Sequence, residues 1–107
     1  GTAAADDIDA QVQWRSVRAP IVARSGDLVQ AESLARAALD MAMKTDALIL
    51  QADTYCELAE VLRLAGRADE ARAAINEAIA LYTAKGDVVS AARSTAWCNR
   101  LPLVSSS

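Results

Sequence analysis

The sequence predicts an all-α fold in which helical hairpins stack side by side into a right-handed solenoid. The first observation is a repeat, because the segment that begins at Gly26 is similar to the one that begins at Gly66. Self-similarity at a fixed period of about 20–50 residues is typical of solenoids, whose units bury their apolar faces against their neighbours. The second is composition: the 107 residues are 53% hydrophobic but only 4% aromatic. A core of small and aliphatic side chains favours closely packed helices over a sheet.

We expect one domain, residues 1–107, made of two helix pairs and a C-terminal capping helix. Consecutive helices are expected to be antiparallel neighbours, because the turns between them are short. The expected units are a flexible lead (1–6), repeat 1 (7–46), repeat 2 (47–86), the capping helix (87–101) and a tail (102–107).

The first pair is predicted to contain a helix over about 7–24 and a second over about 28–44. Pro20 lies inside the first helix and removes a backbone hydrogen bond, so we expect a kink or an early end there. Gly26 marks the turn, and Asp27 is the expected N-cap of the second helix. Apolar residues in the second helix recur with the helical period of 3.6.

The second pair is predicted to contain helices over about 47–65 and 68–85. Gly66 and Gly86 follow these helices at the position where a left-handed residue commonly ends a helix. A fifth helix is expected over about 88–100. Its apolar contacts are expected from Val88, Ala91, Ala92 and Thr95.

The second unit resembles the tetratricopeptide repeat, whose pattern is W-x₂-L-G-x₂-Y, a turn Gly, A-x₃-F and A-x₃-P. The first unit departs from the pattern, because Arg15 and Arg18 stand at the Trp and Leu positions. Both units lack the closing Pro, and their period is longer than the usual 34 residues. The residues that carry the resemblance are Tyr55, Leu58, Ala59, Leu62, Gly66, Ala71, Ile75 and Ala78.

Residues 6–96 also resemble the C-terminal end of large bacterial signalling proteins. In that family, a nucleotide-cyclase or LuxR-type DNA-binding effector module is joined to a signal-transduction ATPase module and a helical-repeat array. The resemblance implies a regulatory domain, and no catalytic motif of the family occurs in the chain. It is carried by the runs QWRSVRAPIVARSGD, AESLARAALDMA, TDAL and LAEVLRLAGRADEARAAINEAIALYTAKGDVVSAAR.

Composition argues against an enzyme, a cofactor and a metal centre. The chain has no His, its four glycines are isolated, and it has no C-x₂-C pair. A net charge of −3 without a basic cluster argues against nucleic acid, and no apolar run approaches the ~20 residues that span a membrane. We expect a cytoplasmic protein with Cys56 and Cys98 reduced.

The tetratricopeptide resemblance implies a concave surface lined by the first helix of each pair. From the third helix this groove would contain Asp53, Cys56, Glu60, Arg63 and Leu64, and from the first Gln13, Ser16, Pro20 and Ala23. Such a groove binds a protein or peptide partner, or it is a solvated inner face whose partner is the next repeat or the parent protein. Asp53, Glu57 and Glu60 form an acidic stripe at i, i+4 and i+7. Such a stripe is a solvated face paired with arginines such as Arg15 and Arg18, or it attracts a cation or takes part in acid/base chemistry.

A second candidate surface lies at the C-terminal end of the stack. Trp97, Leu101, Leu103 and Val104 are expected to form an apolar end face that docks another copy or another module. The alternative is that Trp97 simply packs onto the fourth helix. The leading functional prediction is a non-enzymatic, regulatory protein–protein interaction domain, and the alternative is a homodimerisation module that pairs through the stack ends.

Overall fold

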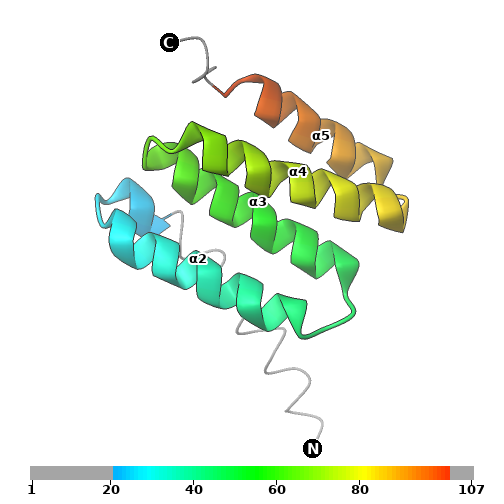
Figure 1. Ribbon diagram of the computed structural model, residues 1–107, viewed down its shortest axis with the longest axis horizontal. Helices are drawn as coiled ribbons and strands as arrows, with labels where there is room; N and C mark the ends of the chain where they lie inside the picture. The colour runs from blue at the N-terminus through cyan, green and yellow to red at the C-terminus, as the bar shows by residue number, and fades with distance from the viewer. Residues whose placement is uncertain (1–20, 102–107) are drawn as a thin grey trace, which may run out of the picture.

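The computed structural model describes residues 21–101, which form helices and turns and no strand within that range (Figure 1). Residues 21–24 are helical and lead into four helices in chain order. These are α2 (Leu28–Met43), α3 (Leu48–Leu64), α4 (Ala68–Lys85) and α5 (Val88–Asn99). The predicted all-α stack of helical hairpins is confirmed. The earlier part of the predicted first helix, including Gln13, Ser16 and Pro20, lies outside the described residues.

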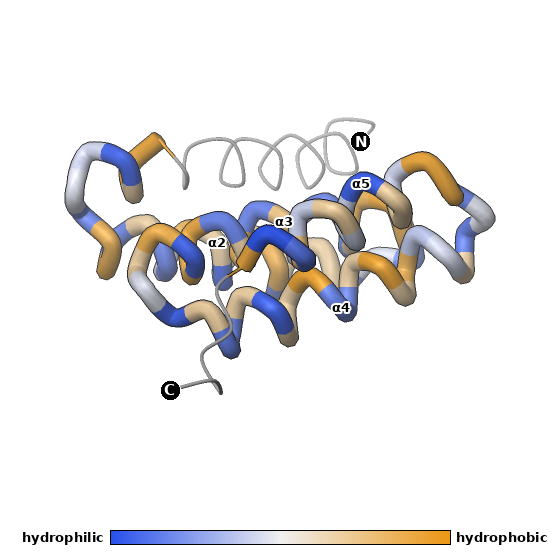
Figure 2. Tube along the Cα trace, turned by 90° about the horizontal axis from the view of Figure 1, so that it is seen from above, coloured by the Kyte–Doolittle hydropathy of each residue, from blue (hydrophilic) through white to orange (hydrophobic). Residues whose placement is uncertain are grey.

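The helices pack as an antiparallel series in which each contacts its neighbours along the chain. α3 packs against α2 and α4, and α4 packs against α5 (Figure 1). Figure 2 shows hydrophobic and hydrophilic residues alternating along each helix, as expected for helices that bury one face. Within residues 21–101, none of the helices combines the length and apolar character that crossing a bilayer requires.

Alanine dominates the core. Small side chains let helix axes approach closely, so the helices are held by extensive contact and not by a few large anchors. Val61 and Thr54 are the largest fully buried side chains among the described residues, and the Thr54 hydroxyl donates to the Gln51 carbonyl oxygen at 2.7 Å. The alanines with 0% exposure are Ala31, Ala38, Ala42, Ala52, Ala59, Ala71 and Ala78.

The helix ends follow the predicted signals. The Asp27 carboxylate accepts a hydrogen bond from the Gln30 amide at 3.1 Å, which confirms the predicted N-cap. Gly66 and Gly86 have φ of +79° and +87°, the left-handed conformation that ends α3 and α4. The glycine stops predicted from the sequence are therefore confirmed.

The predicted apolar face of the fifth helix is wrong in three of four positions. Ala91 is partly buried, but Ala92 and Thr95 are exposed and Val88 is 72% exposed. The buried face of α5 instead carries Ser94 and Cys98, and Leu101 follows the helix. Small polar groups are tolerated there because neighbouring helices supply partners for them: the Ser94 hydroxyl lies 3.7 Å from the Cys56 Sγ, and an Arg72 nitrogen lies 3.5 Å from the Cys98 Sγ.

Candidate interaction surfaces

Two of the predicted groove residues of α3, Asp53 and Cys56, contact α4, and Cys56 also contacts α5. The Asp53 carboxylate accepts a hydrogen bond from the Tyr82 hydroxyl of α4. The Cys56 Sγ lies 3.7 Å from the Tyr82 hydroxyl and 3.7 Å from the Ser94 hydroxyl of α5. Burial, followed by the hydrogen bond to Asp53, raises the pKa of Tyr82, and burial likewise raises the pKa of the Cys56 thiol.

Glu60 connects three parts of the stack. Its carboxylate pairs with Arg63 one turn along α3 and lies 3.9 Å from a nitrogen of Arg24, at the end of the helical residues 21–24. It also accepts a hydrogen bond from the Trp97 indole of α5 at 3.3 Å. The hydrogen bond from Arg63 is the main reason that the pKa of Glu60 is lowered. The predicted arginine partners, Arg15 and Arg18, lie outside the described residues.

Glu57 lies between Asp53 and Glu60 on the same face of α3. It is partly buried, and no hydrogen bond or ion pair joins its carboxyl to any of residues 21–101. Burial raises its pKa from 4.5 to about 7, helped by the negative charges of Glu60 and Asp53 and opposed by Arg24. The acidic stripe is therefore not a uniformly solvated face, because its central carboxyl is partly buried.

The remaining groove residues divide between the surface and the core. Arg63 is exposed and held by Glu60. Leu64 is partly buried against the core, and Ala23 is 5% exposed and belongs to the core. We call the surface formed by Asp53, Cys56, Glu57, Glu60 and Trp97 the α3–α5 face.

The two surfaces expected from the sequence meet on this face. Trp97 is partly buried and donates to Glu60, and Leu101 is 5% exposed. These two side chains are thus directed into the stack, while Leu103 and Val104 lie outside the described residues. The exposed apolar side chains of α5 are Val88 and Val89, at 72% and 67% exposure, at the opposite end of the helix.

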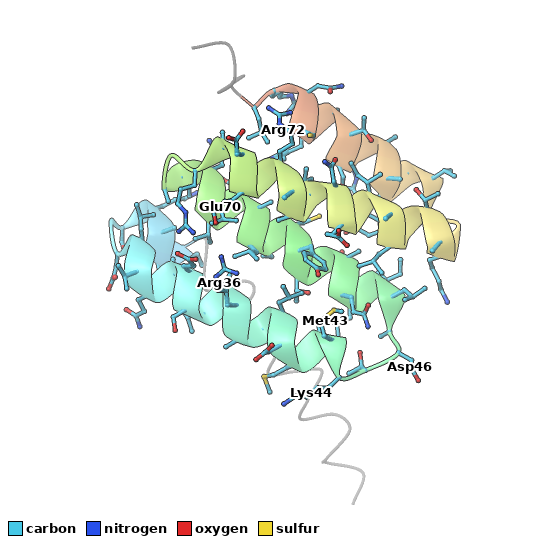
Figure 3. The ribbon with its side chains drawn as sticks, viewed as in Figure 1. Arg36, Met43, Lys44, Asp46, Glu70 and Arg72 are labelled. Atoms are coloured by element: carbon cyan, nitrogen blue, oxygen red, sulfur yellow. The ribbon has the colours of Figure 1, made fainter. Side chains whose placement is uncertain are left out.

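A groove between α2 and α4 was not predicted. Its volume is about 380 Å³, and α3 forms its floor. Figure 3 shows Arg36 of α2 extending toward Glu70 of α4 in this space. The sequence offered no signal for it, since its lining comes from three helices without a common motif. The lining residues are Arg36, Leu39, Tyr55, Leu58, Leu62, Glu70, Ala73, Ala74 and Glu77.

An ion-pair network lies at one end of this groove and joins α2 to α4. Arg67 is the N-cap residue of α4, and its guanidinium reaches Glu32 of α2 at 2.5 Å and Glu70 at 2.6 Å. Glu32 also pairs with Arg36 at 2.7 Å. These hydrogen bonds lower the pKa of Glu32, with that from Arg67 contributing most.

Neither cysteine is disulfide-bonded. Within residues 21–101, no three Cys, Asp or Glu side chains are arranged to hold a metal ion.

Residues 18–84 match the family described as Tetratricopeptide repeat. No curated protein and no solved structure gives a significant match to the chain.

Proposed function

The chain belongs to the tetratricopeptide repeat family, and we propose that it is a non-enzymatic domain that binds a protein or peptide on its α3–α5 face. Repeats of this family generally mediate protein–protein interaction. In helical solenoids, binding surfaces are built from side chains of successive repeats. The α3–α5 face has this property, because Glu60 is contacted from residues 21–24, from α3 and from α5.

The observation that carries the proposal is the partly buried Glu57 carboxyl, which has no hydrogen-bond or ion-pair partner among residues 21–101. A partly buried acid with a pKa of about 7 is costly to maintain, and such perturbed groups concentrate at functional sites. A cationic side chain of a partner would lie between Asp53 and Glu60. Its positive charge would offset the repulsion between these two carboxylates and that of Glu57. The expected partner is thus a protein segment with a basic residue, and a net charge of −3 disfavours nucleic acid.

The biological setting follows from the resemblance of residues 6–96 to the C-terminal repeat arrays of bacterial signalling proteins. The domain is regulatory and cytoplasmic in this proposal, and its partner is another module of the parent protein or a separate protein. Catalysis belongs to other modules, because no catalytic motif of the resembled family occurs in this chain.

A selection from a displayed library of random short peptides tests the binding function. Selected peptides are expected to be enriched in Lys or Arg, and to bind the Glu57→Lys variant at least about fivefold more weakly. The matched control is Asp40→Lys, which changes the net charge equally at an exposed position of α2. Recovery of no binder, or equal binding to both variants, would refute the proposal.

Homodimerisation through the stack ends is the second candidate, and the exposure of Val88 and Val89 favours it. Trp97 and Leu101 are already engaged within the stack, so the dimer would pair through the start of α5. Light scattering over an about hundredfold concentration range should then show a dimer that Val89→Asp converts to a monomer. A monomer at every concentration, or a dimer that persists in the variant, would exclude this contact.

A further inference from the structure

The groove between α2 and α4 has an apolar floor that is firmly held. Leu58 and Leu62 of α3 are 4% and 2% exposed, so their positions are set by the core beneath them. Leu39 of α2 and Ala73 of α4 form parts of the two walls. The groove is open to solvent and has a volume of about 380 Å³, within the range of ligand-binding pockets.

Most charges around the groove are already neutralised. Arg36 pairs with Glu32, and Glu70 pairs with Arg67 through two hydrogen bonds. Glu77, in contrast, makes no hydrogen bond or ion pair with any of residues 21–101. A segment bound in the groove therefore meets a net negative charge.

Tyr55 adds a second polar group to the groove. Its side chain lines the groove and is partly buried, and no hydrogen bond joins its hydroxyl to any residue of the described range. A tyrosine attracts cations through its ring and accepts or donates hydrogen bonds through its hydroxyl. The groove thus combines an aliphatic floor, an aromatic ring and the Glu77 carboxylate, which has no partner among residues 21–101.

We infer that the α2–α4 groove is a second docking site, which takes a segment of a partner protein with an aliphatic side chain next to a lysine or arginine. The aliphatic side chain packs on Leu58 and Leu62, and the cation lies beside Glu77 and Tyr55. An acidic segment is disfavoured by Glu77. The groove shares α3 with the α3–α5 face, but it is lined by Tyr55, Leu58 and Leu62 and by none of the residues that form that face. The inference therefore does not depend on the function proposed for the α3–α5 face.

The test uses the ¹⁵N-labelled chain and three capped peptides that are identical except for a central Lys, Gln or Glu between leucines. The Lys peptide should shift the amide signals of Leu39, Tyr55, Ala73 and Glu77, and the Glu peptide should bind at least about fivefold more weakly. Shifts centred on Asp53, Cys56 and Glu57 would locate binding on the α3–α5 face and overturn the inference. So would the absence of any shift with the Lys peptide at about 1 mM, the weak end of specific affinity.

Two pairs of variants establish that the groove itself is the site. Glu77→Lys should weaken the Lys peptide at least about fivefold, whereas Asp40→Lys, with the same change in net charge, should not. Ala73→Arg should block the groove sterically, and Ala96→Arg, at an exposed position of α5, should leave binding unchanged. Circular dichroism confirms that each variant folds, and equal binding within either pair would refute the assignment.

Discussion

Replacing Glu57 by Gln is expected to stabilise the fold above pH 7 and to have little effect below pH 4.5. Burial, together with the charges of Glu60 and Asp53, raises the pKa of the Glu57 carboxyl to about 7. The substitution keeps the shape of the side chain and removes the charge. Because the chain contains no His, the side chain that ordinarily titrates near neutral pH is absent, and the effect of Glu57 can be observed directly.

The sign follows from proton linkage. The folded state holds the Glu57 proton more tightly than the unfolded chain does. The contribution of Glu57 to stability is therefore fully present below pH 4.5 and is lost as the pH rises through about 7. A tenfold change in proton affinity corresponds to about 1.4 kcal/mol, which sets an upper limit of about 3 kcal/mol for an unscreened carboxyl. Since Glu57 is only partly buried, screening by water reduces the expected gain from Glu57→Gln to about 1–2 kcal/mol.

Urea unfolding monitored by circular dichroism measures the effect at one pH below 4.5 and one above 7. The free energy of unfolding of Glu57→Gln should exceed that of the native chain only at the higher pH. Glu77→Gln is the control, because it makes the same chemical change at an exposed position of α4. A gain of equal size at both pH values, or the same gain in the control, would show that burial of the Glu57 charge is not the cause.

Three further substitutions test the packing and the helix ends. Ala78→Leu should destabilise the fold by about 1–3 kcal/mol because Ala78 is 0% exposed, whereas Ala80→Leu on the solvent side of α4 should be nearly neutral in thermal unfolding. Gly86→Ala should cost about 1 kcal/mol in urea unfolding, from its φ of +87° alone, since a Cβ there meets no atom within 4 Å. Asp87→Ala should lower the Tm by removing the hydrogen bond that the Ser90 amide donates to the Asp87 carboxylate. The difference in Tm between the variant and the native chain should shrink as the pH falls below 3.8.

Local signals were sufficient to predict α2, α3, α4 and α5 and their ends. The predicted start of the fourth helix at residue 68 and its end at residue 85 coincide with the observed α4. Such accuracy is possible where a chemical group fixes the boundary by itself, as Asp27 does by capping and Gly66 does by its positive φ. These effects depend on neighbours in the chain and need no knowledge of tertiary contacts.

The buried face of α5 could not be predicted in the same way. Val88 is more apolar than Ser94, yet it is the exposed one of the two. Which face of a helix is buried depends on the helices beside it, and α5 has α4 on one side and polar groups of α3 within reach of Ser94 and Trp97. Hydropathy is a weak guide when both faces of a helix carry small side chains.

The sequence predicted the acidic stripe of α3 but not that its three carboxylates have different hydrogen-bond partners. Asp53, Glu57 and Glu60 have equivalent spacing, and only tertiary contacts supply Asp53 with Tyr82 and Glu60 with Trp97. Among residues 21–101, Glu57 has no comparable partner. The α2–α4 groove was missed for a related reason, because it exists only where three helices meet.

Position 67 shows how a repeat acquires a specific contact. By the sequence repeat, Arg67 is equivalent to Asp27, which caps α2 with its own carboxylate. Arginine has no acceptor for a backbone amide, and α4 accordingly begins without a side-chain cap. The guanidinium instead binds Glu32 of the preceding repeat and Glu70 of the same repeat. Arg67 therefore joins two repeats, whereas Asp27 caps only its own helix. The shared alanines set the spacing of the helices, whereas positions at which the repeats differ, such as 67, determine how one repeat is joined to the next.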